Sequence, residues 1–174
     1  MVIVRSKLQN VKAQALERFA VRAKRAAGVR GDVDVLVTSS AQMRRLNRRF
    51  RGKNAATDVL SFPAGHDGTE TLRNSSSPSS VRRDFFDHHA GDLAISAEIA
   101  RRNARRLGHT TADELKILIL HGLLHLAGYD HEKDAGEMAR KEARLRRELE
   151  LPASLVERAS DHGKARTAKR SRRP

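Results

Sequence analysis

The sequence predicts an α+β domain in which a small mixed sheet is covered by helices. Short runs rich in β-branched residues, such as residues 33–37, alternate along the chain with longer segments whose apolar residues recur every three or four positions. Glycines follow several of these longer segments, as expected where helices end. At 174 residues and without cysteine, the chain is long enough to form one domain whose core needs no disulfide.

Each element is predicted from its own periodicity and its flanking residues. Ser39 or Ser40 can cap one helix, Thr111 can open a capping box for another, and Pro63 should stop a strand. Met138, Leu145 and Leu149 should face inward from the last helix. The expected order is a strand at 2–4, a helix through 8–23 ended by Gly28, a strand at 33–37, a helix through 43–50, strands at 57–62 and 91–96, a helix at 97–107 ended by Gly108, a helix starting at 111–114, and a charged helix at 132–149.

Two polar segments lie outside this pattern. Residues 64–90 are rich in Gly, Ser, Asp and charged residues, which favours a long flexible loop. Residues 152–174 form a basic segment, in which seven Lys or Arg stand against one acid between Arg158 and Pro174. This composition predicts a disordered tail. We therefore expect a single domain at residues 1–151, followed by the tail.

The most specific pattern is the run from His121 to His131, which contains His125 and Gly128 between them. His121 and His125 are four residues apart and share one face of a helix. Gly128 allows the helix to end and the chain to turn, so that His131 can approach the pair. Three imidazoles leave a fourth coordination position for water or substrate, as in catalytic zinc sites. The pattern predicts one Zn²⁺ per chain, because the oxygen ligands that magnesium prefers are missing from it.

The same histidine spacing occurs in metzincin peptidases, whose pattern is His-Glu-x-x-His-x-x-Gly-x-x-His. Gly122 stands here at the position of the glutamate that serves peptidases as general base. A metallopeptidase therefore stays an alternative supported by ligand spacing alone. Glycine within a helix costs about 1 kcal/mol relative to alanine. We expect a reason for the small size of Gly122, such as close approach of a substrate.

The net charge of +14 indicates an anionic partner. Nucleic acid fits better than a membrane surface, because no amphipathic helix with bulky apolar residues is evident. Aromatic residues make up only 3% of the chain, so phosphate contacts should dominate over stacking on several rings. The longest apolar segment, residues 115–129, is too short to span a membrane, and the first residues do not form a signal peptide. These features predict a cytoplasmic protein.

A group of basic residues precedes the strand at 57–62. Arg44, Arg45, Arg48 and Lys53 are candidates for RNA binding, although a solvated helix face is the plainer interpretation of such a charge run. An arginine close to a metal-bound oxyanion can stabilise the charge that develops on a phosphoryl group.

Three phrases of the sequence together resemble the YbeY family. They are His-Gly-x-x-His-Leu-x-Gly-Tyr-Asp-His, Arg-Gly-Lys-x-x-x-Thr-Asp-Val-Leu-Ser-Phe-Pro and Gly-Asp-Leu-Ala-Ile-Ser, and the resemblance covers roughly residues 2–150. It implies a zinc-dependent endoribonuclease specific for single strands, with a zincin-like metal helix, that acts in ribosomal RNA maturation and ribosome quality control. RNA and the small ribosomal subunit are the implied partners.

The resemblance also implies roles for particular residues. His121, His125 and His131 correspond to the zinc ligands, and Arg51 to a functional arginine ahead of the strand. Asp130 could act as a base or could orient a ligand histidine. Ala56 departs from the family, in which proline is common at this position. A non-catalytic, basic ribosome-assembly factor with structural zinc is a second alternative, but an open fourth position argues against a structural site.

Overall fold

The computed structural model describes residues 2–6, 12–64, 89–130 and 134–152. The elements follow one another as β1 (Val2–Ser6), α1 (Ala13–Ala27), β2 (Asp32–Thr38), α2 (Ser40–Arg51), β3 (Val59–Pro63), β4 (His89–Ser96), α4 (Ala97–Leu107), α5 (Thr111–Leu126) and α6 (Glu137–Glu148).

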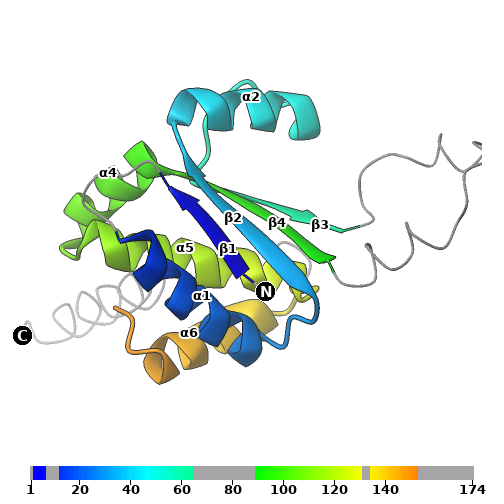
Figure 1. Cartoon of the computed structure of the whole chain (residues 1–174), viewed down its shortest axis with the longest axis vertical. Helices are drawn as coiled ribbons and strands as arrows, with labels where there is room; N and C mark the ends of the chain where they lie inside the picture. Colours follow the sequence, from blue (N-terminus) through cyan, green and yellow to red (C-terminus); the bar gives the residue numbers. More distant parts are fainter. Residues whose placement is uncertain (1, 7–11, 65–88, 131–133, 153–174) are drawn as a thin grey trace, which may run out of the picture.

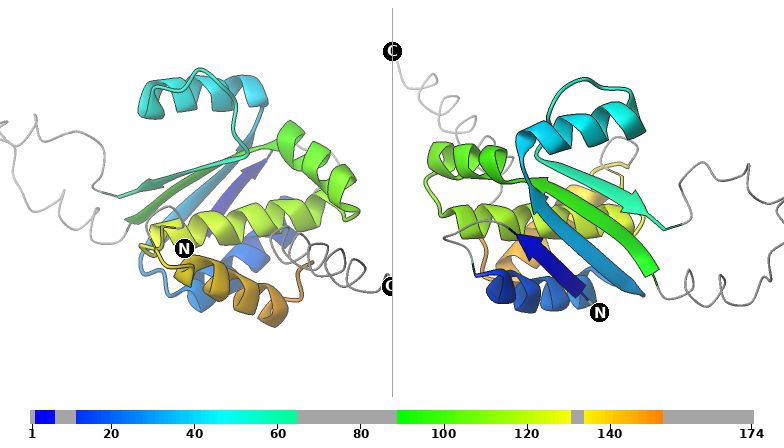
Figure 2. Two further views of the ribbon diagram at one scale, coloured as in Figure 1. Left: turned by 180° about the vertical axis from the view of Figure 1, so that it is seen from behind. Right: turned by 45° about the horizontal axis from the view of Figure 1, so that its top comes forward.

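The four strands form one mixed sheet in the order β1-β2-β4-β3. β1, β2 and β4 are parallel, whereas β3 pairs antiparallel with β4 and lies at the edge. Figures 1 and 2 show α1, α5 and α6 on one face of the sheet and α2 on the opposite face. The predicted α+β class with a small, helix-covered mixed sheet is confirmed.

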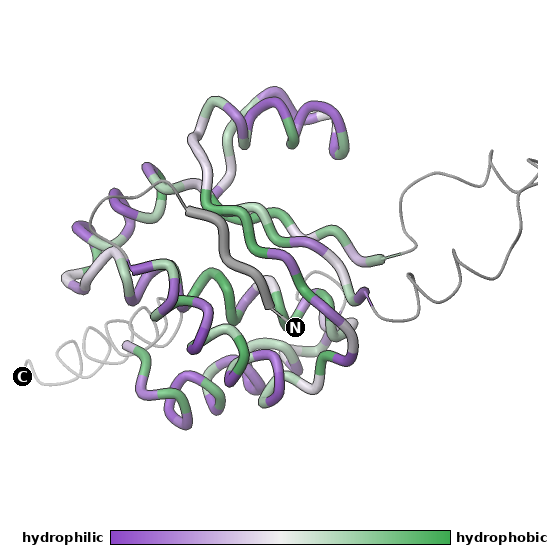
Figure 3. Tube along the Cα trace, viewed as in Figure 1, coloured by the Kyte–Doolittle hydropathy of each residue, from purple (hydrophilic) through white to green (hydrophobic). Residues whose placement is uncertain are grey.

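The main core lies between the sheet and α5. Leu115, Ile119 and Leu123 of α5 are fully buried together with Leu93 and Ile95 of β4. α5 packs against β3, β4, α1, α4 and α6, which explains why it is apolar around most of its circumference. In Figure 3, α5 is coloured mainly as hydrophobic and α2 mainly as hydrophilic.

A smaller apolar cluster holds α2 on the other face of the sheet. It consists of Met43, Leu60 and Ala94, with Leu46 and Phe62 packed against it. Successive side chains of a strand point to opposite faces. Leu60 and Phe62 of β3 therefore support α2, whereas Val59 belongs to the main core under α5.

Several predicted elements are confirmed with small shifts. The helix at 97–107 has the predicted bounds, and the strand at 33–37 extends by one residue at each end. Ser39 caps α2 by accepting a hydrogen bond from the Gln42 amide. Met138, Leu145 and Leu149 are buried as predicted. α1 begins at Ala13, and the proposed helical residue Leu8 lies outside the described part of the chain.

Other predicted boundaries are shifted. The strand predicted at 57–62 is β3, which runs from Val59 to Pro63. Two helices begin at other residues than predicted, because polar side chains cap them there. Thr110, not Thr111, caps α5, since its hydroxyl accepts from the Asp113 amide at 3.1 Å. Glu114 is instead buried against His109, with 2.7 Å between Oε2 and Nε2. α6 begins at Glu137 rather than at residue 132. At this end of the helix, Asp134 accepts hydrogen bonds from the amides of Gly136 and Met138.

The boundary of the predicted loop is shifted as well. β4 begins at His89, so the last two residues of the segment 64–90 belong to a strand. Residues 65–88 and 153–174 lie outside the described residues, and the predictions of a flexible loop and a disordered tail remain predictions. Among the helices of the described ranges, none is both long and apolar enough to cross a membrane.

Candidate metal centre

α5 brings two of the predicted ligands together. The Nε2 atoms of His121 and His125 are 3.2 Å apart, and the two rings are nearly perpendicular, with an angle of 74° between their planes. In a tetrahedral site with Zn–N bonds of 2.0–2.1 Å, two ligand nitrogens lie about 3.3 Å apart. Two unprotonated nitrogens at this distance need a proton or a cation between them. The spacing of the pair therefore fits zinc.

Glu142 of α6 fixes the orientation of His121. Its Oε2 atom lies 3.0 Å from Nδ1 of His121. A carboxylate can only accept, so Nδ1 of His121 carries a proton, and in the neutral tautomer of the ring Nε2 keeps a lone pair that faces His125. Ligand histidines of zinc sites are commonly held in this way by a carboxylate.

Glu142 is held in its charged form by its neighbours. Burial raises the pKa of the Glu142 carboxyl, but the hydrogen bond from His121 and the charge of Arg146 lower it more, so that the net pKa lies below the ordinary 4.5. Arg146 donates from Nε to Glu142 Oε1 at 2.9 Å, and its Nη2 contacts the same oxygen. The chain Arg146–Glu142–His121 thus forms a partly buried support for one predicted ligand.

The third predicted ligand, His131, lies outside the described residues. Within the described ranges, which leave His131 out, no group of three His, Cys, Asp or Glu is suited to hold a metal ion. The structure therefore brings together His121 and His125 and adds Glu142. The convergence of His131 on this pair stays a prediction.

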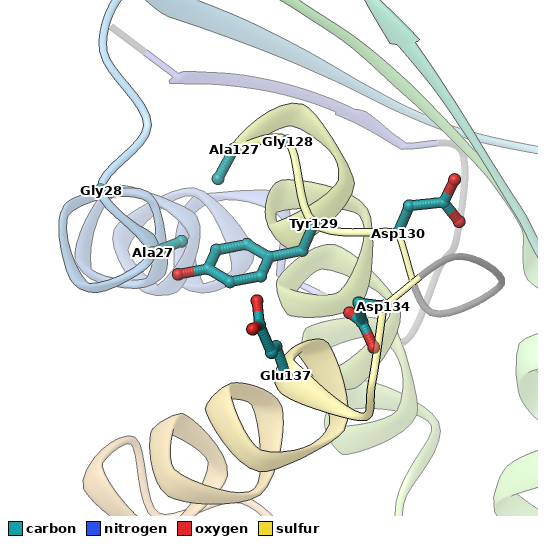
Figure 4. A pocket seen from close by; sticks show the side chains of 8 residues that line it. All are labelled: Ala27, Gly28, Ala127, Gly128, Tyr129, Asp130, Asp134 and Glu137. Atoms are coloured by element: carbon teal, nitrogen blue, oxygen red, sulfur yellow. The ribbon is translucent and has the colours of Figure 1, made fainter.

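Asp130 follows the turn at Gly128, whose φ of 91° lies in the left-handed region that glycine favours. Its carbonyl accepts from the Asp134 amide at 2.9 Å. With Tyr129, Asp134 and Glu137 it lines a cavity of about 570 Å³, and its side chain points away from Tyr129 and Glu137 (Figure 4). Glu142 contacts the predicted ligand His121, and the role predicted for Asp130 is untested.

Gly122 lies between the two histidines and faces the sheet. A Cβ atom at this position would be 2.7 Å from Leu93 Cδ2 and 3.3 Å from Ser61 Oγ. The Ser61 hydroxyl also donates to the Gly122 carbonyl at 3.4 Å. Helix–sheet packing explains the small residue, and the expectation that substrate approach requires it is not needed. The close packing places the histidine turn of α5 directly beside β3.

The basic candidates lie on the other side of the sheet. Arg51 ends α2, and Lys53 follows the left-handed Gly52. Arg44, Arg45, Arg48, Arg51 and Lys53 are all exposed, and Arg44 donates to Asn54 Oδ1 at 2.9 Å. Figures 1 and 2 show α2 and α5 on opposite faces of the sheet, in which β3 is an edge strand. The structure thus groups the basic residues with one another and places the histidine pair across β3.

The sequence reasoning missed Glu142. It lies 21 residues from His121 in a helix whose charged residues form no local pattern with the histidines. Only the packing of α6 against α5 brings the two together. One indirect sign was available in the sequence. Glu142 stands four residues before Arg146, a spacing at which a carboxylate and a guanidinium can pair on one face of a helix.

Comparison with known proteins agrees with these features. Residues 2–150 match the family described as Endoribonuclease YbeY. A Koribacter versatilis protein named Endoribonuclease YbeY is 51% identical over 99% of this chain and 100% of its own length, and one from Solibacter usitatus is 46% identical over 83% and 84%. The solution structure of a Thermotoga maritima protein, 27% identical, aligns with 86% of this chain and 89% of its own, with a TM-score of 0.55. The chain belongs to the YbeY endoribonuclease family.

Proposed function

We propose that this chain is a zinc-dependent endoribonuclease that cleaves single-stranded regions of ribosomal RNA. Membership of a family that acts in ribosomal RNA maturation supports the reaction and the substrate class. The observation that carries the metal is the His121–His125 pair, whose Nε2 atoms are 3.2 Å apart while Nδ1 of His121 is bound to a carboxylate. RNA of the small ribosomal subunit is the proposed partner, and the cytoplasm is the proposed compartment.

His121, His125 and His131 would hold one Zn²⁺. When bound, the ion would act as a Lewis acid toward the scissile phosphate or its attacking oxygen. Glu142 keeps the Nδ1 proton on His121 and so leaves Nε2 available as a ligand. We assign Asp130, the neighbour of His131 in the chain, the corresponding orienting role for that histidine.

Arg51 is proposed to stabilise the negative charge that builds on the phosphoryl group in the transition state. Its position at the exposed end of α2 leaves the guanidinium available to a ligand that passes over the edge strand β3. The exposed side chains of Arg44, Arg45, Arg48 and Lys53 would attract the RNA backbone. This attraction should weaken steeply as salt increases.

The first experiment compares substrates. Purified protein is incubated with single-stranded RNA and with casein, each with and without a chelator. We expect cleavage of RNA alone and its loss with the chelator. The His125→Ala protein should lose both stoichiometric zinc and cleavage. Full zinc in that variant would contradict the proposed ligand set, and chelator-sensitive cleavage of casein would favour the peptidase instead.

The second experiment separates catalysis from binding at Arg51. Arg45→Ala is the matched control, since both arginines are exposed residues of the same helix. Arg51→Ala should remove about 2–4 kcal/mol of transition-state stabilisation and so slow cleavage at saturating RNA. Its dissociation constant for RNA should change as little as that of the Arg45→Ala control. Arg51→Lys should restore only part of the rate, because an ammonium lacks the planar fork of the guanidinium. Equal, small losses in both alanine variants would remove Arg51 from the mechanism.

A further inference from the structure

Phe50 is an exposed ring on a basic helix. Its residue exposure is 51%, and it is one of three large hydrophobic residues exposed in the described part of the chain, with Val21 and Leu36. The whole chain contains only five Phe, one Tyr and no Trp. Leaving a scarce ring in water forgoes burial that would stabilise the fold, so the exposure of Phe50 calls for a physical account.

The ring is supported from the sheet side. Phe62 of β3 contacts it in a T-shaped arrangement, with 5.1 Å between the ring centroids and 67° between the planes. Phe62 packs in turn against the cluster of Met43, Leu60 and Ala94. Phe50 is therefore held at a fixed place above the edge strand.

The surroundings of the ring are cationic. The guanidinium carbon of Arg49 lies 5.3 Å from the Phe50 ring centroid, and Arg48 and Arg51 belong to the same last turn of α2. The helix carries no acidic residue. A flat apolar surface surrounded by arginines complements a ligand that combines a planar base with negative phosphates.

We propose that Phe50 stacks one base of a single-stranded RNA and that Arg49 binds the adjacent phosphate. In the free protein, Arg49 lies over the ring. A surface contact between a cation and a ring is weaker than a stacked base, so the base displaces the guanidinium, which then reaches the phosphate. A base inside a duplex cannot offer its face in this way. The stack thus selects single strands.

This inference rests on the proposed function and adds a register to it. Phe62 points to α2, whereas the Ser61 hydroxyl contacts Gly122 of α5, so adjacent residues of β3 serve the two faces of the sheet. β3 is an edge strand of the sheet, and RNA held at Phe50 can cross this edge toward His121 and His125. The stacked base would set which phosphate reaches the histidines.

The test compares binding of two short ligands by fluorescence anisotropy: a uniform single-stranded RNA and an abasic ribose-phosphate chain of equal length. Phe50→Ala should bind the RNA at least about fivefold more weakly, which is the lower end of base–aromatic stacking, and should bind the abasic chain as the parent protein does. Phe50→Tyr should restore RNA binding, whereas Phe50→Leu, which keeps an apolar side chain, should not. Val21→Ala, a matched change of an exposed apolar residue on α1, should alter neither ligand.

Arg49→Gln should weaken binding of both ligands to the same extent and make the salt dependence shallower. Equal binding of the RNA by Phe50→Ala and parent, or equal losses for both ligands, would overturn the stacking role. Circular dichroism of each variant verifies that it is folded. If the protein binds RNA through Phe50 but cleaves none, the proposed function fails and the stack stands. If it cleaves RNA and Phe50→Ala binds normally, the reverse holds.

Discussion

Replacing Gly122 by alanine tests how closely the histidine turn of α5 is bound to the sheet. The new Cβ atom would lie 2.7 Å from Leu93 Cδ2 and 3.0 Å from Leu93 Cδ1. Carbon atoms pack best at about 3.5–4.0 Å, so one partner must move by roughly 1 Å. Leu93 is only 1% exposed and belongs to the main core, which leaves its side chain little room to rotate.

Two opposing terms set the size of the effect. Alanine gains about 1 kcal/mol over glycine in a helix. Inserting a methyl group into a packed core costs about 1–3 kcal/mol. We therefore expect Gly122→Ala to lower the free energy of unfolding by about 1 kcal/mol, with a fall in melting temperature of about 2–4 °C for a domain of this size.

A double-mutant cycle with Leu93→Ala identifies the cause. Leu93→Ala alone should cost about 2–5 kcal/mol, because it empties the space beside Gly122. In that background Gly122→Ala should become stabilising by up to about 1 kcal/mol, which gives a coupling of about 2 kcal/mol. Urea unfolding followed by circular dichroism measures all four proteins. Stabilisation by Gly122→Ala in the parent, or the same effect in both backgrounds, would refute the packing explanation.

Three further predictions concern charge. Glu142→Gln should lower zinc affinity by about 10- to 100-fold, measured by competition with a chelator, and an unchanged affinity would show that His121 needs no carboxylate partner. Burial raises the pKa of Glu98, but hydrogen bonds from Ser40 lower it by more than burial raises it, so that the net pKa lies below 4.5. The stabilising contribution of Glu98 is therefore present above pH 4.5 and lost as the pH falls. Glu98→Gln should show a smaller acid-induced loss of stability in urea titrations than the parent protein. An unaltered pH profile would contradict this. Truncation after Leu151 should make the salt dependence of RNA binding shallower at constant zinc content, and an unchanged slope would exclude the tail from the RNA contact.

Local signals predicted the elements of this fold well. The helix at 97–107 has the predicted bounds because Ser96 caps it and Gly108 ends it, and both signals are read from adjacent residues. The start of α5 was misplaced by one residue because Thr110 and Thr111 are both suitable caps. The hydrogen bond between His109 and Glu114, which removes Glu114 from the capping box, joins two buried side chains across the start of α5, a pairing that no capping signal predicts.

The candidate site was only partly predictable, because some of its residues meet only through the packing of separate elements. His121 and His125 lie one helical turn apart, so a helix alone brings them together. Glu142 required the position of α6, and the separation of Arg51 from the histidines required the choice of sheet face for α2. Periodicity indicates that a helix has an apolar face but not which surface covers that face, so neither the position of α6 nor the placement of α2 follows from it.

The alternation of side chains along β3 gives a structural reason for the sequence Thr-Asp-Val-Leu-Ser-Phe. On one face, Ser61 Oγ lies 3.3 Å from the position that a Cβ atom on Gly122 would take, and the Ser61 hydroxyl donates to the Gly122 carbonyl. A larger residue at 61 would therefore push α5 outward and move the histidines that flank Gly122. On the other face, Leu60 and Phe62 hold α2 and the exposed ring of Phe50. A shift of β3 by one residue would exchange these faces and disturb both helices at once. The strand therefore acts as the common support of the histidine helix and the basic helix, although it contributes none of the predicted metal ligands.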